Sequence, residues 1–495
     1  MRYISTRGGD EVSSARAIVR GIAPDGGLYV PESLPVISRG EVRALADMDY
    51  PSRAALILRK MLPDFTGEEL LEMARKSYAR FEGDFPCPAR ELEKTGVRVL
   101  ELFHGPTMAF KDMALQMLPH LLRSAALKTG EKREIAILTA TSGDTGKAAL
   151  EGFRDCDGTS VTVFYPKGGV SRVQETQMVT SRGENTHVIA VRGNFDDAQT
   201  GVKRLFTDEK FIARMNERGR VLSSANSINL GRLAPQVAYY FSAAADMLKE
   251  GRADWDRPAD VCVPTGNFGN ILACWYAKRM GAPIGRLICA SNANRVLTDF
   301  IRTGVYDRCR EFYRTASPSM DILISSNLER FLWEIGGAEK VKGWMASLSQ
   351  CGVFRLDEKE RQILSSNFLC GCADDGETMA EIKRVYEADG YVLDPHTAVA
   401  SAVLRGLEKD PGRTVLLVST ASPFKFGPAV CLSLGIGLSD PADAFEAAER
   451  LKETCGLCVP LAFEELKDLP VRHRAECGRE DMGEAVLAAL EGQAG

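Results

Sequence analysis

The segment LFHGPTMAFKDMALQ, residues 102–116, places one lysine, Lys111, among apolar residues. A lysine normally keeps its ammonium group in water, so an apolar setting needs a chemical reason. Burial favours the neutral amine, and a neutral amine can condense with an aldehyde to form a Schiff base. The alternative is a surface lysine whose stem lies along apolar residues. That is the more common role for a lysine.

A second segment, VCVPTGNFGNILACW, has the pattern of a strand followed directly by a helix. Gly266 and Gly269 lie at the junction, where free backbone N–H groups and the helix dipole favour an anion. Glycine also allows the backbone to approach a ligand closely. The alternative is a tight turn with no ligand, but the context favours a phosphate-binding loop.

A third segment, TATSGDTGKAAL, contains a Gly-Lys pair that invites comparison with nucleotide-binding loops. A P-loop has glycine where this chain has Thr141, and serine or threonine where Ala148 follows Lys147. The dinucleotide fingerprint G-x-G-x-x-G is also missing from both loops. What remains is a loop rich in hydroxyl groups, which suits a carboxylate or a phosphate.

A reactive lysine and a phosphate loop without a nucleotide motif together favour pyridoxal phosphate. That cofactor needs one lysine, one phosphate cradle and a partner for its ring nitrogen. The sequence therefore predicts a pyridoxal-phosphate site that includes Lys111 and the loop at Gly266–Asn270.

Repeated strand–loop–helix units must position these residues. The strands are expected at 134–140, 159–166, 259–264, 284–291 and 413–420. Short apolar strands that alternate with helices imply an α/β fold, with open and largely parallel sheets flanked by helices. In such folds ligands bind at the carboxyl ends of the strands, where the glycine-rich loops lie.

The two ends of the chain have a different pattern. Residues 1–90 are rich in predicted helices, at 13–22, 52–62 and 66–81, and the Gly/Pro-punctuated segment 25–35 cannot be helical. FPCPAR, residues 85–90, is typical of a linker. We expect an N-terminal domain at 1–90, a catalytic α/β region of two interleaved subdomains at 91–440, and a peripheral helical extension at 441–495.

The composition excludes several classes of protein. The 495 residues include 45% hydrophobic and 26% charged residues, with a net charge of −5. No basic field favours nucleic acid or an anionic membrane. No apolar run has the length of a membrane span, and the first residues lack the apolar core of a signal peptide, so we expect a cytoplasmic protein. Thirteen scattered cysteines indicate reduced thiols. Neither CGLC at 455–458 nor CGC at 370–372 has the paired spacing of a zinc site, so no metal is predicted.

The order of motifs along the chain resembles the threonine synthases, of the larger bacterial and fungal type, among the tryptophan-synthase-β-like enzymes. The motifs are YISTRGG, DGGLYVPE, FHGPTMAFKD, TSGDTG, GNFDDAQ, NSINLGRLAPQ, PTGNFGN, SPSMDI, DPHTAVA and STASPFKFG. The resemblance implies fold type II of the pyridoxal-phosphate enzymes and a helix-rich N-terminal domain. It also implies O-phospho-L-homoserine as the small-molecule substrate.

The resemblance implies a role for each matching residue. Lys111 matches the lysine that forms the Schiff base and later moves protons at the substrate. Thr420 matches the hydroxyl that meets the ring nitrogen, where a hydroxyl leaves the ring a weaker electron sink than an aspartate would. The phosphate loop matches Gly266, Asn267, Phe268, Gly269 and Asn270. The loop for the substrate's α-carboxylate matches Thr141, Ser142, Asp144 and Thr145.

Two positions depart from the family pattern. The family commonly has histidine where this chain has Ser422, and an acid where it has Asn270. For the substrate phosphate, candidates are the polar residues of NSINLGR and GGVSRVQ, because arginine matches phosphate geometry well. These are Asn226, Ser227, Asn229 and Arg232, together with Ser171 and Arg172. His104 suits core packing or a cofactor contact equally.

The implied reaction converts O-phospho-L-homoserine and water to L-threonine and phosphate, by γ-elimination and β-addition of water, as the last step of threonine biosynthesis. One alternative is a threonine or serine dehydratase-like lyase of the same fold. Another is a pyridoxal-phosphate-binding protein without catalytic activity. Whether the chain is a monomer or a homodimer stays open.

Overall fold

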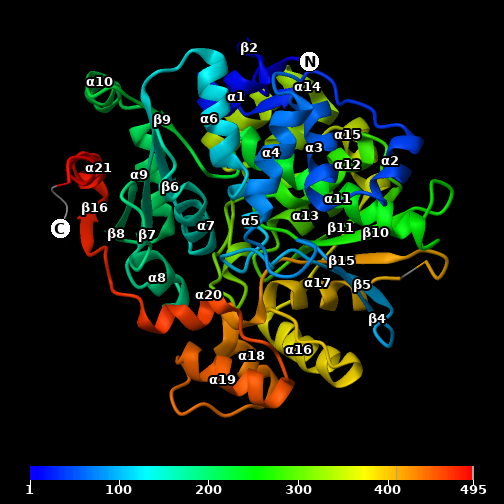
Figure 1. The fold of residues 1–495 in the computed structure, drawn as a ribbon. Helices are drawn as coiled ribbons and strands as arrows, with labels where there is room; N and C mark the ends of the chain where they lie inside the picture. Colours follow the sequence, from blue (N-terminus) through cyan, green and yellow to red (C-terminus); the bar gives the residue numbers. More distant parts are fainter. Residues whose placement is uncertain (409, 493–495) are drawn as a thin grey trace.

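Two large β-sheets organise the chain (Figure 1). The structure is a computed structural model and describes residues 1–408 and 410–492. In Figure 1 a five-stranded sheet lies on the left and a six-stranded sheet on the right, with the N-terminal helices above the larger sheet. The predicted α/β class with largely parallel sheets is confirmed.

The larger sheet has the strand order β14-β11-β10-β15-β5-β4, and only the β4–β5 pair is antiparallel. Its strands are β4 (Ala89–Leu92), β5 (Val97–Glu101), β10 (Ala259–Pro264), β11 (Ile284–Ser291), β14 (Phe368–Cys372) and β15 (Val415–Ser419). Helix α17 (Pro395–Arg405) covers one face, and α12 (Gly269–Arg279) and α13 (Val296–Thr303) lie on the other side (Figure 1). The central strands are buried on both faces, as their continuous apolar runs require.

The smaller sheet has the order β16-β8-β7-β6-β9, and all its pairs are parallel. Its strands are β6 (Glu134–Ala140), β7 (Thr159–Pro166), β8 (Thr186–Arg192), β9 (Arg220–Ser223) and β16 (Ala475–Gly478). Its helices are α7 (Asp144–Phe153), α8 (Arg172–Val179), α9 (Phe195–Leu205) and α10 (Glu209–Glu217). Ile135 and Ile137 join the main core, whereas Ala136 and Leu138 pack in a separate cluster with α9. This alternation fixes the register of β6.

The N-terminal part combines a small antiparallel sheet with helices. Its elements are β1 (Tyr3–Ser5), β2 (Glu11–Val12), β3 (Tyr29–Pro31), α1 (Ser14–Arg20), α2 (Arg39–Leu45), α3 (Tyr50–Met61) and α4 (Gly67–Tyr78). The helices predicted at 13–22, 52–62 and 66–81 are confirmed as α1, α3 and α4. Thr66 and Glu69 form a capping box at the start of α4, which explains where that helix begins.

Further helices connect these parts. They are α5 (Asp112–Leu115), α6 (Leu118–Thr129), α11 (Leu230–Lys249), α14 (Leu328–Cys351), α15 (Glu358–Asn367), α16 (Asp375–Asp389) and α18 (Gly427–Leu434). Strands β12 (Val305–Asp307) and β13 (Val353–Arg355) form an antiparallel pair. The N-terminal helices α2 and α3 pack on α11. Within the described residues, no helix combines the length and apolar character that crossing a bilayer requires.

The C-terminal segment differs from its purely helical prediction. It contains α19 (Ala444–Cys455), α20 (Leu461–Glu464) and α21 (Met482–Leu490), but Ala475–Gly478 form β16 at the edge of the smaller sheet. In Figure 1 this segment passes from the bottom of the molecule to its left edge. A strand of four residues, AECG, has too little alternation to be separated from a loop by pattern.

Candidate active site

Three neighbouring strands of the larger sheet carry the predicted cofactor residues at their carboxyl ends. Strands β10, β15 and β5 lie side by side, and the chain continues from them to Gly266, Thr420 and Lys111 respectively. Strand β6 of the smaller sheet ends just before Thr141. Ligands bind at this edge of parallel sheets, so the topology brings together segments that are about 300 residues apart in sequence.

Backbone contacts join the lysine segment to the end of β15. Ala109 and Ala421 form an isolated antiparallel bridge, and the amide of Phe110 donates to the carbonyl oxygen of Thr420 at 2.8 Å. The turn before the lysine is held by Asp112, which accepts from the backbone and hydroxyl of Thr107 at 2.8 and 2.7 Å. Burial raises the pKa of Asp112 to about 6, and the two Thr107 hydrogen bonds limit the rise.

Lys111 has little contact with water. Its side chain is 11% exposed, its Nζ is 3.3 Å from an oxygen of Asp144 and from the Ser319 hydroxyl, and it lies over the Phe110 ring. Burial lowers its pKa, Lys425 and Arg232 lower it further, and Asp144 opposes them. The apolar setting read from the sequence is therefore present, and it favours the neutral amine.

Asp144 lies between two lysines. Its carboxylate contacts Nζ of the fully buried Lys425 at 2.7 Å as well as Lys111, and it accepts from the amide of Gln174 at 3.0 Å. Burial alone would raise the pKa of Asp144, but the two lysines hold it well below the ordinary value. An ionised carboxylate here would repel the α-carboxylate of a substrate. The side chain of Asp144 therefore serves to pair with Lys111 and Lys425.

The loop after β10 has the geometry of an anion site. Phe268 adopts the left-handed conformation (φ 61°) and helix α12 begins at Gly269, so its first amides are free. A Cβ on Gly266 would lie 2.6 Å from the carbonyl oxygen of Ser319, which explains the glycine there. Asn270 accepts from the hydroxyls of Tyr239 and Tyr240 at 2.7 and 2.6 Å.

Thr420 is almost buried, and its amide donates to the hydroxyl of Thr397 at 3.4 Å. In the part of the chain that the structure describes, its own hydroxyl makes no hydrogen bond. A hydroxyl without a protein partner, on a mostly buried residue next to the lysine segment, is free to meet a ligand nitrogen.

A cleft of about 1170 Å³ opens beside these segments. Its polar lining includes Thr141, Ser142, Thr145, Asn226, Ser227 and Asn267, which were predicted from the sequence, and also Arg7, Ser325 and Ser326. Lys111, Gly266, Gly269 and Thr420 do not line it. The cleft therefore borders the loops after β6 and β10 from the side of the smaller sheet and of the N-terminal part, and its lining does not include Lys111.

Two more of the predicted residues, Asn229 and Arg232, are buried near the start of α11. Asn229 is fully used as the cap of α11, since its amide donates to the carbonyls of Ile18 and Ser224 and its oxygen accepts from Gly231. Arg232 is fully buried, and no carboxylate among the described residues pairs with it. Burial lowers its pKa to about 10. An unpaired buried cation near Lys111 favours an anionic ligand.

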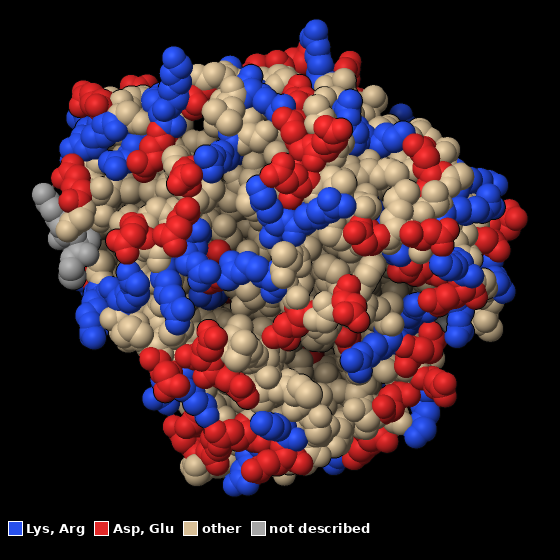
Figure 2. Space-filling model, viewed as in Figure 1, with Lys and Arg blue, Asp and Glu red and all other residues tan. Residues whose placement is uncertain are grey.

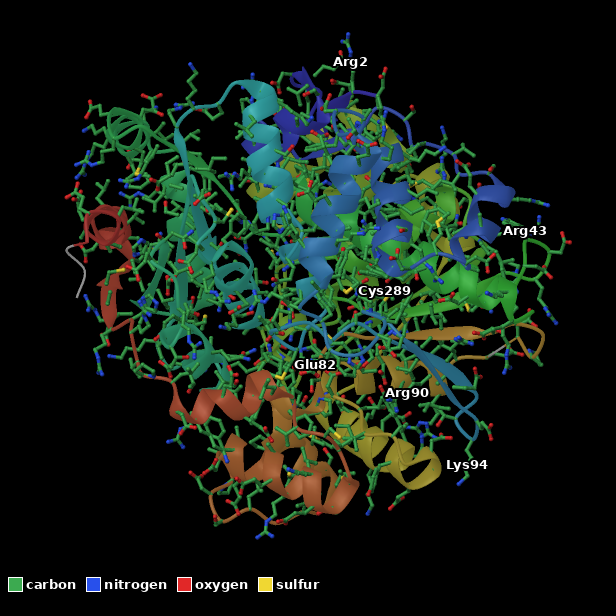
Figure 3. All side chains as sticks on the ribbon, in the orientation of Figure 1. Arg2, Arg43, Glu82, Arg90, Lys94 and Cys289 are labelled. Carbon is green, nitrogen blue, oxygen red and sulfur yellow. The ribbon has the colours of Figure 1, made fainter. Side chains whose placement is uncertain are left out.

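Other candidates lie away from the lysine. Ser171 caps α8, and the exposed Arg172 pairs with Asp440 at 3.7 Å. Nε2 of His104 donates to the carboxylate of Glu101 at 2.8 Å. Glu101 also pairs with Arg90, labelled in Figure 3 on the hairpin of β4 and β5. The amide of Ser422 donates to the carbonyl of Met108, so this residue helps to hold the lysine segment.

Three residues beside Lys111 were not predicted from the sequence: Lys425, Ser319 and Gln174. Lys425 lies in the motif STASPFKFG and Ser319 in SPSMDI, and the sequence alone indicates no role for either side chain. Only the fold brings these segments to Lys111, so spacing alone gave no signal.

Comparisons with known proteins identify the family. A family model described as "Threonine synthase N terminus" matches residues 2–78, and one described as "Pyridoxal-phosphate dependent enzyme" matches residues 80–350. The threonine synthase of Pseudomonas aeruginosa is 38% identical, over 91% of this chain and 95% of that protein. The crystal structure of a PLP-bound threonine synthase from Brucella melitensis matches with a TM-score of 0.87 and 37% identity, over 99% of both chains.

The chain belongs to the threonine synthase family of pyridoxal-phosphate-dependent enzymes. Threonine synthase-like 1 of Homo sapiens is 42% identical over 85% of this chain. The chain spans less than two thirds of these longer relatives, 58% of the human protein and 60% of the one from Pongo abelii. The resemblance of the motifs and the predicted pyridoxal-phosphate fold are thus confirmed.

The residues at this site fit pyridoxal phosphate. The buried lysine, the free amides at the start of α12 and the unpartnered Thr420 hydroxyl supply the three kinds of group that pyridoxal phosphate needs. Residues 1–408 and 410–492 contain no group of three His, Cys, Asp or Glu side chains that could hold a metal ion.

Proposed function

We propose that this chain is a threonine synthase, a carbon–oxygen lyase that converts O-phospho-L-homoserine and water to L-threonine and phosphate. The observation that carries the proposal is the buried Lys111 at the point where the ends of β5, β10 and β15 meet. The match over nearly the full length of a PLP-bound threonine synthase supports it.

In this proposal Lys111 holds the cofactor, the backbone of Gly266–Asn270 holds its phosphate, and Thr420 meets its ring nitrogen. When bound, pyridoxal phosphate supplies an electron sink for negative charge that develops on the substrate. A hydroxyl at Thr420 can hydrogen-bond the nitrogen without keeping a proton on it.

Lys111 is also suited to move protons. When Lys111 is not bonded to the cofactor its amine would be free, and burial favours the neutral form of that amine. It can take the proton from Cα and return one in the closing steps. Asp144 and Ser319 orient the Nζ that does this.

The substrate's two anionic groups need separate partners. The hydroxyls and backbone of Thr141, Ser142 and Thr145 line the cleft and suit the α-carboxylate. Asn226 and Ser227 line the same cleft, and the unpaired Arg232 lies behind them. These groups supply the positive and hydrogen-bonding partners for the phosphate.

A turnover assay tests the function. Purified protein with added pyridoxal phosphate should release equal amounts of phosphate and threonine from O-phosphohomoserine. Lys111→Ala should lose the visible absorbance of the bound cofactor and all measurable turnover, because it removes the amine that bonds to the cofactor aldehyde. Lys76→Ala, which removes an exposed lysine of α4 that pairs with Glu72, is the matched control and should keep both.

Other outcomes would identify the alternatives. Ammonia and a keto acid from threonine or serine, without phosphate release, would indicate a dehydratase-like lyase. Cofactor absorbance without any product would indicate a binding protein, and a Lys111→Ala variant that kept both properties would end the assignment of Lys111.

The same proposal places the protein in the cytoplasm, which the thirteen free cysteines support. It includes no nucleic-acid or membrane partner.

For the domain limits we propose 1–90, 91–440 and 441–495, the last of which contributes strand β16 to the smaller sheet.

A further inference from the structure

We propose that Asn327 donates a hydrogen bond to the cofactor phosphate, and that Arg330 is the residue that positions it. The inference rests on the proposed function, because it assumes that the loop at Gly266–Asn270 holds that phosphate. It adds a side-chain donor and a buried cation to a cradle otherwise made of backbone amides.

Asn327 lies against the start of α12. Its backbone amide donates to the carbonyl of Asn267 at 3.1 Å, and its Nδ2 is 3.3 Å from the position that a Cβ on Gly269 would take. The side chain is completely buried, and within the described part of the chain Nδ2 has no hydrogen-bond partner. A buried amide donor costs free energy unless something accepts from it.

Arg330 determines which way the amide points. A guanidinium can only donate, and Nη1 of Arg330 donates to Oδ1 of Asn327. The Asn327 oxygen must therefore face Arg330, which leaves the NH₂ group facing the first turn of α12. The free amides of that helix and Nδ2 of Asn327 thus converge on one place, where an anion would satisfy both.

Arg330 itself is a buried cation without a counterion. It is fully buried, and its other donors reach only backbone carbonyls, those of Tyr29 at 3.0 Å, Ser227 at 3.3 Å and Ile228. No carboxylate in residues 1–408 and 410–492 forms an ion pair with it. A doubly charged phosphate one side chain away supplies the missing negative charge.

This arrangement links the N-terminal part of the chain to the cradle. Tyr29 belongs to β3, and the neighbouring Glu329 accepts from Thr6 at 2.6 Å and from Arg7 at 3.0 Å. The motifs YISTRGG and DGGLYVPE therefore hold the first turn of α14, directly after Asn327. The structure gives these motifs a physical task that their sequence did not reveal.

The test compares pyridoxal phosphate with pyridoxal, which has the aldehyde and ring but no phosphate. Asn327→Asp keeps an acceptor for Arg330 but replaces the donor with a negative charge. Its Kd for pyridoxal phosphate, from absorbance titration, should rise by roughly 10- to 100-fold, while its Kd for pyridoxal stays unchanged. Asn367→Asp is the matched control, because Asn367 also faces a cation, Lys278 at 2.9 Å, and contacts no residue of the cradle.

A measurement on the unmodified chain covers the case in which Asn327→Asp does not fold. Hydrogen exchange of the cofactor-free protein should slow at both 266–270 and 325–330 when inorganic phosphate is added. Protection at 266–270 alone, or an Asn327→Asp variant with unchanged affinity for pyridoxal phosphate, would overturn the inference. If the unmodified chain bound neither pyridoxal phosphate nor pyridoxal, the proposed function itself would fail.

Discussion

Asp144 and Lys425 control the charge of Lys111 in opposite directions. The carboxylate of Asp144 favours the ammonium form of Lys111, and the ammonium of Lys425 disfavours it. Arg232, Ser319 and the Phe110 ring complete the surroundings of Nζ. Because burial is the largest effect, the pKa of Lys111 is below its ordinary value, which favours the neutral and reactive form of the amine.

Substitutions at these two positions should move the pH dependence of cofactor incorporation in opposite directions. Lys425→Met removes a cation, so the pKa of Lys111 rises and incorporation at pH 7 slows, on the order of tenfold. Asp144→Asn removes the carboxylate, so that pKa falls and the midpoint moves to lower pH. The measurement is the rate at which the cofactor absorbance appears, followed from about pH 6 to about pH 10.

Asp144→Asn leaves Lys425 buried and unpaired, so its thermal unfolding must be measured as a control. Midpoints that moved in the same direction in both variants would contradict this account. The sequence predicted the apolar setting of Lys111 from its neighbours in the chain. It could not predict Lys425, which lies 314 positions later and reaches Asp144 only through the fold.

The hydrophobic pattern of the sequence predicted the strands that have a continuous apolar run. Strands β6, β7, β10 and β11 agree with their predicted ranges, and β15 is shorter by a few residues. The short strands β9 and β14 carry no such signal, and pairing with the longer β6 and β11 makes them strands. The position of the phosphate loop was predictable because a strand, two glycines and a helix follow one another locally.

Gly269 at the start of α12 should not tolerate a branched side chain. A Cβ there would already lie 3.3 Å from Nδ2 of Asn327, so the methyl groups of Gly269→Val would fill the cradle. We expect the affinity for pyridoxal phosphate to fall by roughly tenfold or more, with little loss of fold. Gly343→Val, in α14, is the control, since a Cβ at Gly343 would meet nothing within 4 Å. Equal affinities in the two variants would remove Gly269 from the phosphate site.

At the scale of the whole molecule, the C-terminal segment packs against both the larger and the smaller sheet. Residues of α19 and α20 join the core of the larger sheet, and β16 and α21 cover the smaller one. On the face shown in Figure 2, acidic and basic side chains are interspersed, in accord with the small net charge. The sequence predicted only a peripheral extension here, because the apolar positions of this segment are spread over short elements. The structure shows that the segment packs into the cores of both sheets.

Met482 is where this last segment should be tested. It is buried at the start of α21, in one cluster with Val202 and Phe211, and it lies against Gly201. Met482→Ala leaves a cavity, so we expect the smaller-sheet half to lose about 2–4 kcal/mol of unfolding free energy. Hydrogen exchange should quicken in β8 and α9 and stay unchanged in β10, which has no residue in the cluster of Met482. The cofactor absorbance at Lys111 should persist. Met73→Ala, at a half-buried position of α4, is the control. Equal acceleration in β8 and β10 would mean that the two sheets unfold as one unit, and that the C-terminal segment is no more than a cover.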